Sequence, residues 1–105
     1  MSLCQSEFNI ASSTVARNVE LTNLYYGGDK SAGTCLLYPN GEVDPWSSQS
    51  ILNSTSNYVQ TLWVPGASHH AWTHPSTAQD QDSVVQARAT IRKFVADALS
   101  QDCYT

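Results

Sequence analysis

An apolar run leads directly into a polar turn in the stretch Cys35-Leu36-Leu37-Tyr38-Pro39-Asn40-Gly41-Glu42-Val43-Asp44-Pro45-Trp46. Its first four residues are continuously apolar and lie between Gly33 and Pro39, which is typical of a short strand buried on both faces. The residues that follow are rich in Asn, Gly, Asp and Pro, which favour turns. The stretch therefore predicts a buried strand at residues 35–38 whose carboxyl end opens into a loop carrying Asp44.

A second stretch repeats this order of elements. Residues 58–64 are rich in β-branched and aromatic side chains and stop at Pro65-Gly66, which predicts a strand. Gly66-Ala67-Ser68-His69-His70 follows, and His69 lies 25 positions after Asp44. Each of the two loops thus follows a short apolar run, and together they offer one carboxylate and one imidazole.

Helical patterns alternate with these strands. Residues 12–22 predict a helix with Ser12 or Ser13 as its cap, which Gly27-Gly28 brings to an end. Residues 47–56 are polar and only weakly helical. From 82 to 100, apolar residues recur at helical spacing, and Asp80 and Asp82 lie where the helix dipole favours negative charge: the apolar residues are Val84, Ala87, Ile91, Phe94, Val95 and Ala98.

This order of elements predicts an α/β fold with two short parallel strands and about three helices. In parallel sheets, functional side chains come from the loops at the carboxyl ends of the strands. Asp44 and His69 occupy such loops. At 105 residues, the chain is one domain or less, and we expect residues 1–105 to form a single partial domain.

Composition excludes several classes of partner. Charged residues make up 13% of the chain, against about 25% in an average protein, and the net charge is −4. The five Lys and Arg residues do not cluster, so we expect neither nucleic acid nor anionic membrane to bind. No apolar stretch approaches the roughly 20 residues that a membrane-spanning helix needs.

Three cysteines and one sequon bear on the compartment. Cys4, Cys35 and Cys103 are an odd number, so at most one disulfide forms within the chain. Asn53-Ser54-Thr55 is a glycosylation sequon, which has meaning only in the secretory pathway. Residues 1–5 lack the basic and apolar segments of a signal peptide. The odd cysteine and the sequon nevertheless favour a secreted or lysosomal origin.

Asp44 and His69 are the residue types of two members of a nucleophilic triad. In such a triad a carboxylate orients a histidine, and the histidine moves the proton of a Ser or Cys nucleophile. Ser68 stands beside the histidines, but no Gly-x-Ser-x-Gly elbow surrounds it. The sequence therefore predicts part of an active site, without its nucleophile.

Other interpretations of these residues stay open. Turn aspartates usually cap their own backbone, which would make Asp44 a plain turn residue. The tryptophans Trp46, Trp63 and Trp72 are more often core anchors than ligand contacts.

A metal site is a further alternative. His69, His70 and His74 are three imidazoles within six positions, and Cys35 or Asp44 could complete a zinc site. However, adjacent histidines on an extended backbone point to opposite faces, and no Cys-x-x-Cys or His-Glu-x-x-His pattern occurs. We therefore expect no metal and no cofactor.

The two loop motifs, Asn-Gly-x-x-Asp-Pro-Trp at 40–46 and Gly-x-x-His-His at 66–70, resemble the serine peptidase family of prolyl carboxypeptidase, dipeptidyl peptidase II and thymus-specific serine peptidase. The resemblance extends to Asn23-Leu24-Tyr25-Tyr26-Gly27-Gly28, to Asp82-Ser83-Val84-Val85-Gln86-Ala87-Arg88 and to Cys4-Gln5-Ser6-Glu7-Phe8. It covers nearly the whole chain, but only the C-terminal part of the family's sequence. The segment between Phe8 and Tyr25 is shorter than in mammalian members.

This resemblance implies the C-terminal part of an α/β-hydrolase fold and a serine-type exopeptidase that cleaves peptide bonds near proline. Asp44 then matches the triad aspartate, His69 the triad histidine, and Trp46 a tryptophan of the pocket for the substrate's proline. His70 is the alternative base. The nucleophilic serine and the helical insertion domain would lie outside these 105 residues, so the isolated chain is expected to be inactive.

A non-catalytic alternative also follows from the element pattern. Two short strands and three helices leave sheet edges and apolar helix faces that need cover. We therefore expect the chain either to pack against the rest of a larger hydrolase or to self-associate. A truncated product that acts as a binding module is the runner-up to the peptidase.

Overall fold

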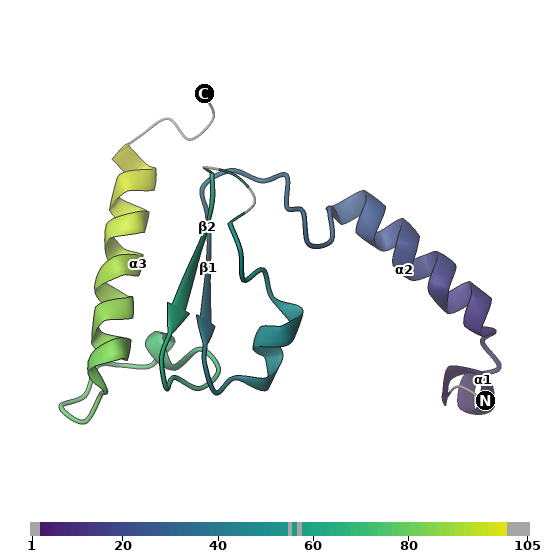
Figure 1. Cartoon of the computed structure of the whole chain (residues 1–105), viewed down its shortest axis with the longest axis horizontal. Helices are drawn as coiled ribbons and strands as arrows, with labels where there is room; N and C mark the ends of the chain where they lie inside the picture. Colours follow the sequence, from purple (N-terminus) through teal and green to yellow (C-terminus); the bar gives the residue numbers. More distant parts are fainter. Residues whose placement is uncertain (1–2, 55, 57, 101–105) are drawn as a thin grey trace. The chain divides into compact units, whose positions relative to one another are not determined.

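The computed structural model describes residues 3–54, 56 and 58–100 (Figure 1). Along the chain lie α1 (Leu3–Phe8), α2 (Ser12–Tyr26), β1 (Leu36–Gly41), the 3-10 helix η1 (Pro45–Gln49), β2 (Val59–Val64), the 3-10 helix η2 (Ala71–Thr73) and α3 (Asp82–Ser100). The chain divides into two compact units, Met1–Ala32 and Gly33–Thr105. Whether both belong to the single partial domain expected above stays a prediction.

The first unit consists of α1 and α2, and neither helix has a buried residue. The predicted cap at Ser12 or Ser13 is wrong, since the N-cap is Ala11 and Ser12 is already helical. The predicted stop at the glycine pair is confirmed: Gly27 adopts a left-handed conformation, with φ 93°, and its N–H donates to Asn23 O at 2.8 Å. The helix runs to Tyr26 rather than to about residue 22, because no residue before the first glycine interrupts it.

The second unit contains a two-stranded parallel sheet, in which β1 pairs with β2 from Leu36↔Val59 to Gly41↔Val64. The predicted α/β class, with two parallel strands and three α-helices, agrees with this architecture. The α/β-hydrolase fold as a whole remains an expectation from the resemblance. The predicted polar helix at 47–56 is wrong, since the only helix there within the described residues is η1 (Pro45–Gln49).

The expectation that the first strand is buried on both faces is also wrong. In β1 only Asn40 and Gly41 are buried, and residues 36–39 are half-buried. The strand also starts one residue later than predicted and continues to Gly41. Residues 36–39 of β1 are only partly covered, because the buried residues of α3 lie in its first two turns. On the neighbouring strand, Val59 at the same end of the sheet is fully buried.

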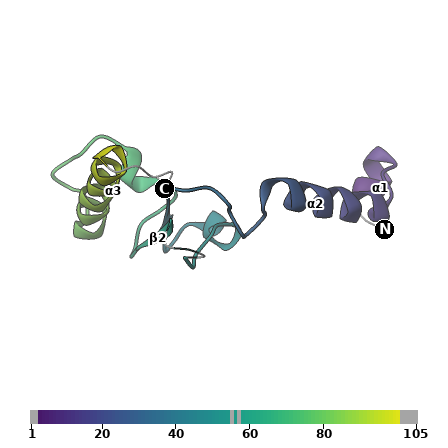
Figure 2. The same cartoon turned by 90° about the horizontal axis from the view of Figure 1, so that it is seen from above.

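A small core lies at the carboxyl ends of the strands. Val64 and Ala67 pack there against Val84 and Ala87 of α3, and Leu62, Ala71 and Trp72 complete the cluster. Helix α3 has the predicted bounds, but only the first part of its apolar stripe is buried, and Val95 is 48% exposed. The core therefore supports the end of the sheet from which the two loops depart, where α3 also begins (Figure 1). Figure 2 shows α3 beside β2 when this unit is seen from above.

No helix in residues 3–54, 56 and 58–100 is long and apolar enough to cross a membrane. Cys35 is disulfide-bonded, and Cys4 carries a free thiol. Cys103 lies outside the described residues.

Candidate active site

A hydrogen bond between two side chains links the loops that follow β1 and β2. The aspartate loop (residues 42–44) carries Asp44, and the histidine loop (residues 65–70) carries His69. Asp44 Oδ2 lies 2.7 Å from His69 Nδ1. The two residues are 25 positions apart in sequence, and the parallel pairing of the strands brings their loops to the same edge of the sheet.

Asp44 is held by bonds within its own turn. Its Oδ1 accepts from the N–H of Trp46 at 2.9 Å, and its own N–H donates to Gly41 O at 3.2 Å. Asp44 is thus the N-cap of η1, with Pro45 at the first position, where its missing N–H has no cost. Asp44 therefore caps its own turn and also pairs with His69. Its Oδ1 accepts from the Trp46 N–H, and its Oδ2 is bonded to His69.

The environment of Asp44 keeps it ionised. The residue is only 7% exposed. Burial by itself raises the pKa of Asp44, but the hydrogen bond from His69, the Trp46 N–H and the positive potential of His69 and His70 together lower that pKa below its usual value. An ionised carboxylate only accepts hydrogen bonds, so Nδ1 of His69 carries the proton.

Gly41 lets the end of β1 approach the histidine loop, whereas Asn40 bonds to β1 itself and to residue 51. A Cβ at Gly41 would lie 2.8 Å from Ser68 O and closer still to Ala67 O, so only glycine lets the two loops approach. The buried side chain of Asn40 donates to Tyr38 O at 3.1 Å and to Ile51 O at 3.3 Å. Asn-Gly at this point is thus a packing requirement as well as a turn signal.

Backbone bonds join the two loops. Val43 N donates to Ala67 O at 3.1 Å, and Glu42 N donates to Val64 O at 3.1 Å. Glu42 Oε2 in turn accepts from Gly66 N at 2.8 Å. These bonds extend the strand pairing past Gly41. They align the two loops at positions that come before Asp44 and His69 in the sequence.

The imidazole of His69 is half-exposed. Its side chain is 55% exposed, and within the described part of the chain Nε2 makes no hydrogen bond. An imidazole whose Nδ1–H is held by a buried carboxylate, and whose Nε2 is accessible, can accept a proton from a nearby hydroxyl.

The three histidines lie closer together than expected. His70 has a left-handed backbone, with φ 42°, and its ring centroid lies 4.6 Å from that of His69 and 5.4 Å from that of His74. The extended backbone assumed in the sequence argument is therefore wrong. Even so, no three His, Cys, Asp or Glu residues within 3–54, 56 and 58–100 are arranged to hold a metal ion.

Trp46 and Asn53, the other predicted site residues, are both at the surface. Trp46 follows Asp44 in η1 and is 65% exposed, so it is not a core anchor in this structure. Asn53 is exposed, and Ser54 next to it donates to Ser56 O at 2.8 Å. Thr55 of the sequon lies outside the described residues.

An open groove of about 350 Å³ runs between β2 and the start of α3, lined by Leu62, Trp63, Pro65, Ser83, Gln86 and Thr90 together with Asp82 and Ala87. Neither Asp44 nor His69 lines this groove.

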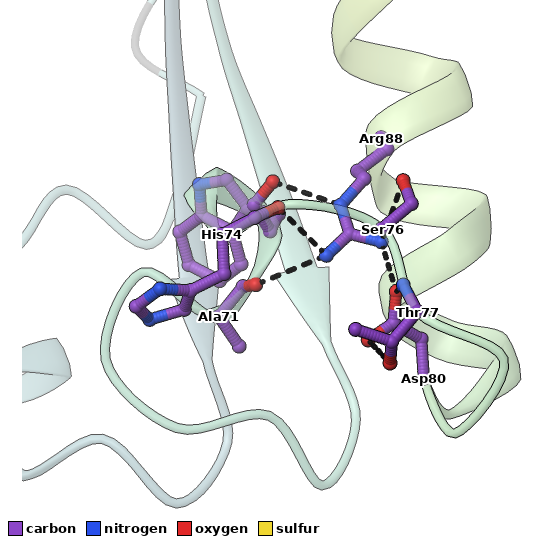
Figure 3. A network of polar contacts seen from close by, with 7 residues as sticks. Ala71, His74, Ser76, Thr77, Asp80 and Arg88 are labelled. Carbon is purple, nitrogen blue, oxygen red and sulfur yellow. Dashed lines mark hydrogen bonds and ion pairs between the residues drawn. The ribbon is translucent and has the colours of Figure 1, made fainter.

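Sequence reasoning missed Arg88 as a structural residue. It is 8% exposed and projects from α3 (Figure 3), next in sequence to the core residue Ala87. Its guanidinium forms an ion pair with Asp80 and donates to backbone carbonyls just after His70. A single arginine within the apolar stripe was the available signal, because charged residues are rarely buried unless they are paired.

Comparison with known proteins places the chain in a family. The model of the family described as serine carboxypeptidase S28 matches residues 1–91. Thymus-specific serine protease of Mus musculus is 32% identical over 99 residues, which cover 94% of this chain and 19% of that protein. The protein of the same name in Homo sapiens is 31% identical over 91 residues, or 87% of this chain and 18% of its own length. Lysosomal Pro-X carboxypeptidase of Bos taurus is 28% identical over 80 residues, or 76% and 16%.

The chain spans about a fifth of the length of the thymus-specific relatives. No solved structure matches it. The matches confirm the resemblance carried by the two loop motifs and the blocks around them. The chain belongs to the serine carboxypeptidase S28 family of serine peptidases.

Proposed function

We propose that this chain supplies the aspartate and histidine of a Ser-Asp-His triad in a serine exopeptidase that cleaves peptide bonds near proline. One observation carries the proposal: a buried, ionised Asp44 bonded to Nδ1 of a half-exposed His69, at 2.7 Å. Family membership supports it, because the family consists of serine peptidases.

The reaction assigns a separate task to each ring nitrogen. Nε2 of His69 accepts the proton of the serine hydroxyl as that oxygen attacks the peptide carbonyl, and later donates it to the leaving amine. Nδ1 keeps its proton throughout and donates to Asp44. The carboxylate fixes the tautomer and stabilises the imidazolium that forms during each transfer.

The nucleophile is proposed to come from outside this chain. No Gly-x-Ser-x-Gly elbow occurs in the 105 residues, and Ser68 is a backbone neighbour of His69 without such a turn. The oxyanion hole likewise needs donors that this sequence does not identify. We therefore expect the isolated chain to turn over no peptide by this mechanism.

Specificity for proline is supported by two observations. Relatives named lysosomal Pro-X carboxypeptidase match the chain, and Trp46 exposes its indole one residue past the Asp44-Pro45 turn. An exposed aromatic ring beside a catalytic residue provides a flat apolar wall that suits a pyrrolidine ring. The same relatives support a lysosomal or secreted parent protein, in which Asn53 would be available for glycosylation.

Exposed apolar surface favours the runner-up function, a binding or self-associating module. Helix α2 buries nothing, and Leu24, Tyr25 and Tyr26 are each more than three-quarters exposed. Such a surface needs cover, either from the rest of the parent hydrolase or from another copy.

The first experiment measures the native product. An antibody against residues 82–105 isolates the protein from its source, and the protein is then sized and treated with a fluorophosphonate probe that labels activated serines. A labelled band several times larger than 11.5 kDa is expected. An unlabelled band at 11.5 kDa would reject the peptidase and support the binding module.

A further inference from the structure

Arg88 uses all of its donors on one short segment of chain. Nε donates to Trp72 O at 3.0 Å, and Nη2 donates to His74 O at 3.1 Å and to Ala71 O at 3.5 Å. Nη1 donates to Ser76 Oγ at 3.4 Å and to Asp80 Oδ2. Figure 3 shows the guanidinium enclosed by these acceptors.

The three carbonyls belong to the backbone that directly follows His69 and His70. Within this segment η2 is a single turn, and its local bonds are few: Ala71 N donates to Ser68 O at 3.3 Å, and Thr73 N donates to His70 O at 2.9 Å. The left-handed residue His70 stands between His69 and this turn. A sparsely populated backbone conformation persists where its surroundings hold it in place.

Helix α3 gives the guanidinium a rigid base. Arg88 lies one residue after Ala87 and one turn after Val84, both of which are buried in the core. A planar fork of five N–H donors on a packed helix fixes the direction of several carbonyls at once, which a lysine ammonium cannot do.

We propose that Arg88 is a positioning residue for His69: from α3 it fixes the carbonyls of Ala71, Trp72 and His74, and thereby keeps the His69 imidazole on Asp44. The catalytic meaning of this role rests on the proposed function. The structural claim, that the Asp44–His69 hydrogen bond depends on Arg88, stands separately.

Asp80 balances the charge of the guanidinium. It accepts from Thr77 N at 2.9 Å and from Thr77 Oγ1 at 3.0 Å in addition to Arg88. The hydrogen bond from Arg88, helped by the Thr77 bonds and against the effect of burial, lowers the pKa of Asp80 to about 2. The ion pair therefore persists at the acidic pH of a lysosome.

The test uses proton NMR on the whole 105-residue chain, where turnover plays no part. A proton shared between a histidine Nδ1 and a carboxylate gives a resonance far downfield of the amide region. We expect Arg88→Met to abolish the downfield resonance. The backbone contacts between β1 and β2 should remain.

Arg88→Lys separates the two interactions of the arginine. It keeps a positive charge next to Asp80 but loses the fork that reaches three carbonyls. We expect it to lose the downfield resonance as Arg88→Met does. If Arg88→Lys kept the resonance, the proposal would be overturned in favour of the ion pair alone, and this arm stays decisive if Arg88→Met fails to fold.

Arg92→Met is the matched control, because Arg92 lies one turn along the same helix and is exposed. It should leave the His69 signals unchanged. A loss of the resonance in Arg92→Met, or its persistence in Arg88→Met, would overturn the proposal. An inactive parent protein with an Arg88-dependent resonance would instead reject the proposed function and leave this inference intact.

Discussion

The aspartate loop and the histidine loop are hydrogen-bonded to each other, but their two functional side chains are held by different parts of the chain. Asp44 is fixed by partners within three positions: Gly41 O accepts its N–H, and the Trp46 N–H donates to its carboxylate. The backbone beyond His69 is instead fixed by Arg88, 14 to 17 positions further along. Local turn chemistry thus places the carboxylate, whereas tertiary packing of α3 places the imidazole.

The largest expected effect is a loss of turnover, and it tests which histidine acts as the base beside Asp44. In the full gene product, His69→Ala should reduce kcat/KM by on the order of 10⁴-fold or more, since a triad without its base retains only the help of binding and the oxyanion hole. His70→Ala is the matched control and should retain most activity. Peptidase assays on a proline-containing peptide measure both. Loss of turnover in His70→Ala alone would reverse the assignment of the base.

The next effect concerns Gly41, where the two loops touch. Gly41→Ala places a Cβ against the carbonyls of Ala67 and Ser68, and this backbone cannot move without breaking the Val43–Ala67 bond. Overpacking of this kind costs about 1–3 kcal/mol of the free energy of unfolding. Chemical denaturation of the chain measures it.

Gly28→Ala serves as the comparison, because Gly28 has a positive φ but only ordinary contacts around an added Cβ. Its cost should come from backbone strain in the first unit and leave the Asp44–His69 resonance unchanged. Equal loss of that resonance in both variants would show that the approach of the loops at Gly41 is not what aligns the pair.

A smaller effect tests the packing that supports the histidine loop. Val84 is buried and Val85, its neighbour on α3, is 52% exposed. Val84→Ala should lower the free energy of unfolding by about 1–2 kcal/mol, and Val85→Ala by less than about 0.5 kcal/mol. Thermal or denaturant unfolding of both variants measures the difference. Similar losses at the two positions would mean that α3 does not pack through Val84.

The sequence predicts the local half of this comparison well. The Asn-Gly-x-x-Asp-Pro-Trp stretch contains the turn, the cap and the carboxylate within seven residues, and the glycine after Tyr26 ends α2 as expected. The period of the apolar residues gives the bounds of α3. Each of these features is decided by residues within a turn or two of one another.

The other half depends on distant partners. The sequence predicts that Asp80 interacts with the helix dipole, whereas Asp80 pairs with Arg88. It also predicts that His69 and His70 point to opposite faces, whereas their ring centroids lie 4.6 Å apart. It also buries β1 on both faces, whereas only the carboxyl end of the strand is covered. These errors share one cause: a pattern along the chain does not show which neighbours arrive from elsewhere.

The smallest expected effect is on stability at low pH, and it distinguishes Asp80 from Asp44. Asp80 has its pKa lowered from 3.8 to about 2, so the folded state binds this proton less readily than the unfolded state does. Its contribution to stability is therefore fully present above about pH 4 and is lost as the pH falls through about 2. Thermal melts between about pH 6 and about pH 2 should show Asp80→Asn below the parent chain at the upper end, with the gap closing towards the lower end.

The contribution of Asp80 to stability depends on Arg88, because the hydrogen bond from Arg88 is the main cause of its lowered pKa. In an Arg88→Met background, Asp80→Asn should cost much less, because the cation that lowers the pKa of Asp80 is gone. The pKa of Asp44 is lowered through His69 and the Trp46 N–H, so Asp44→Asn should remain as costly in that background only if the histidine loop stays in place. A smaller loss of stability from Asp44→Asn in that background would show that Arg88 also supports the Asp44 carboxylate. The aspartate loop and the histidine loop would then be energetically coupled.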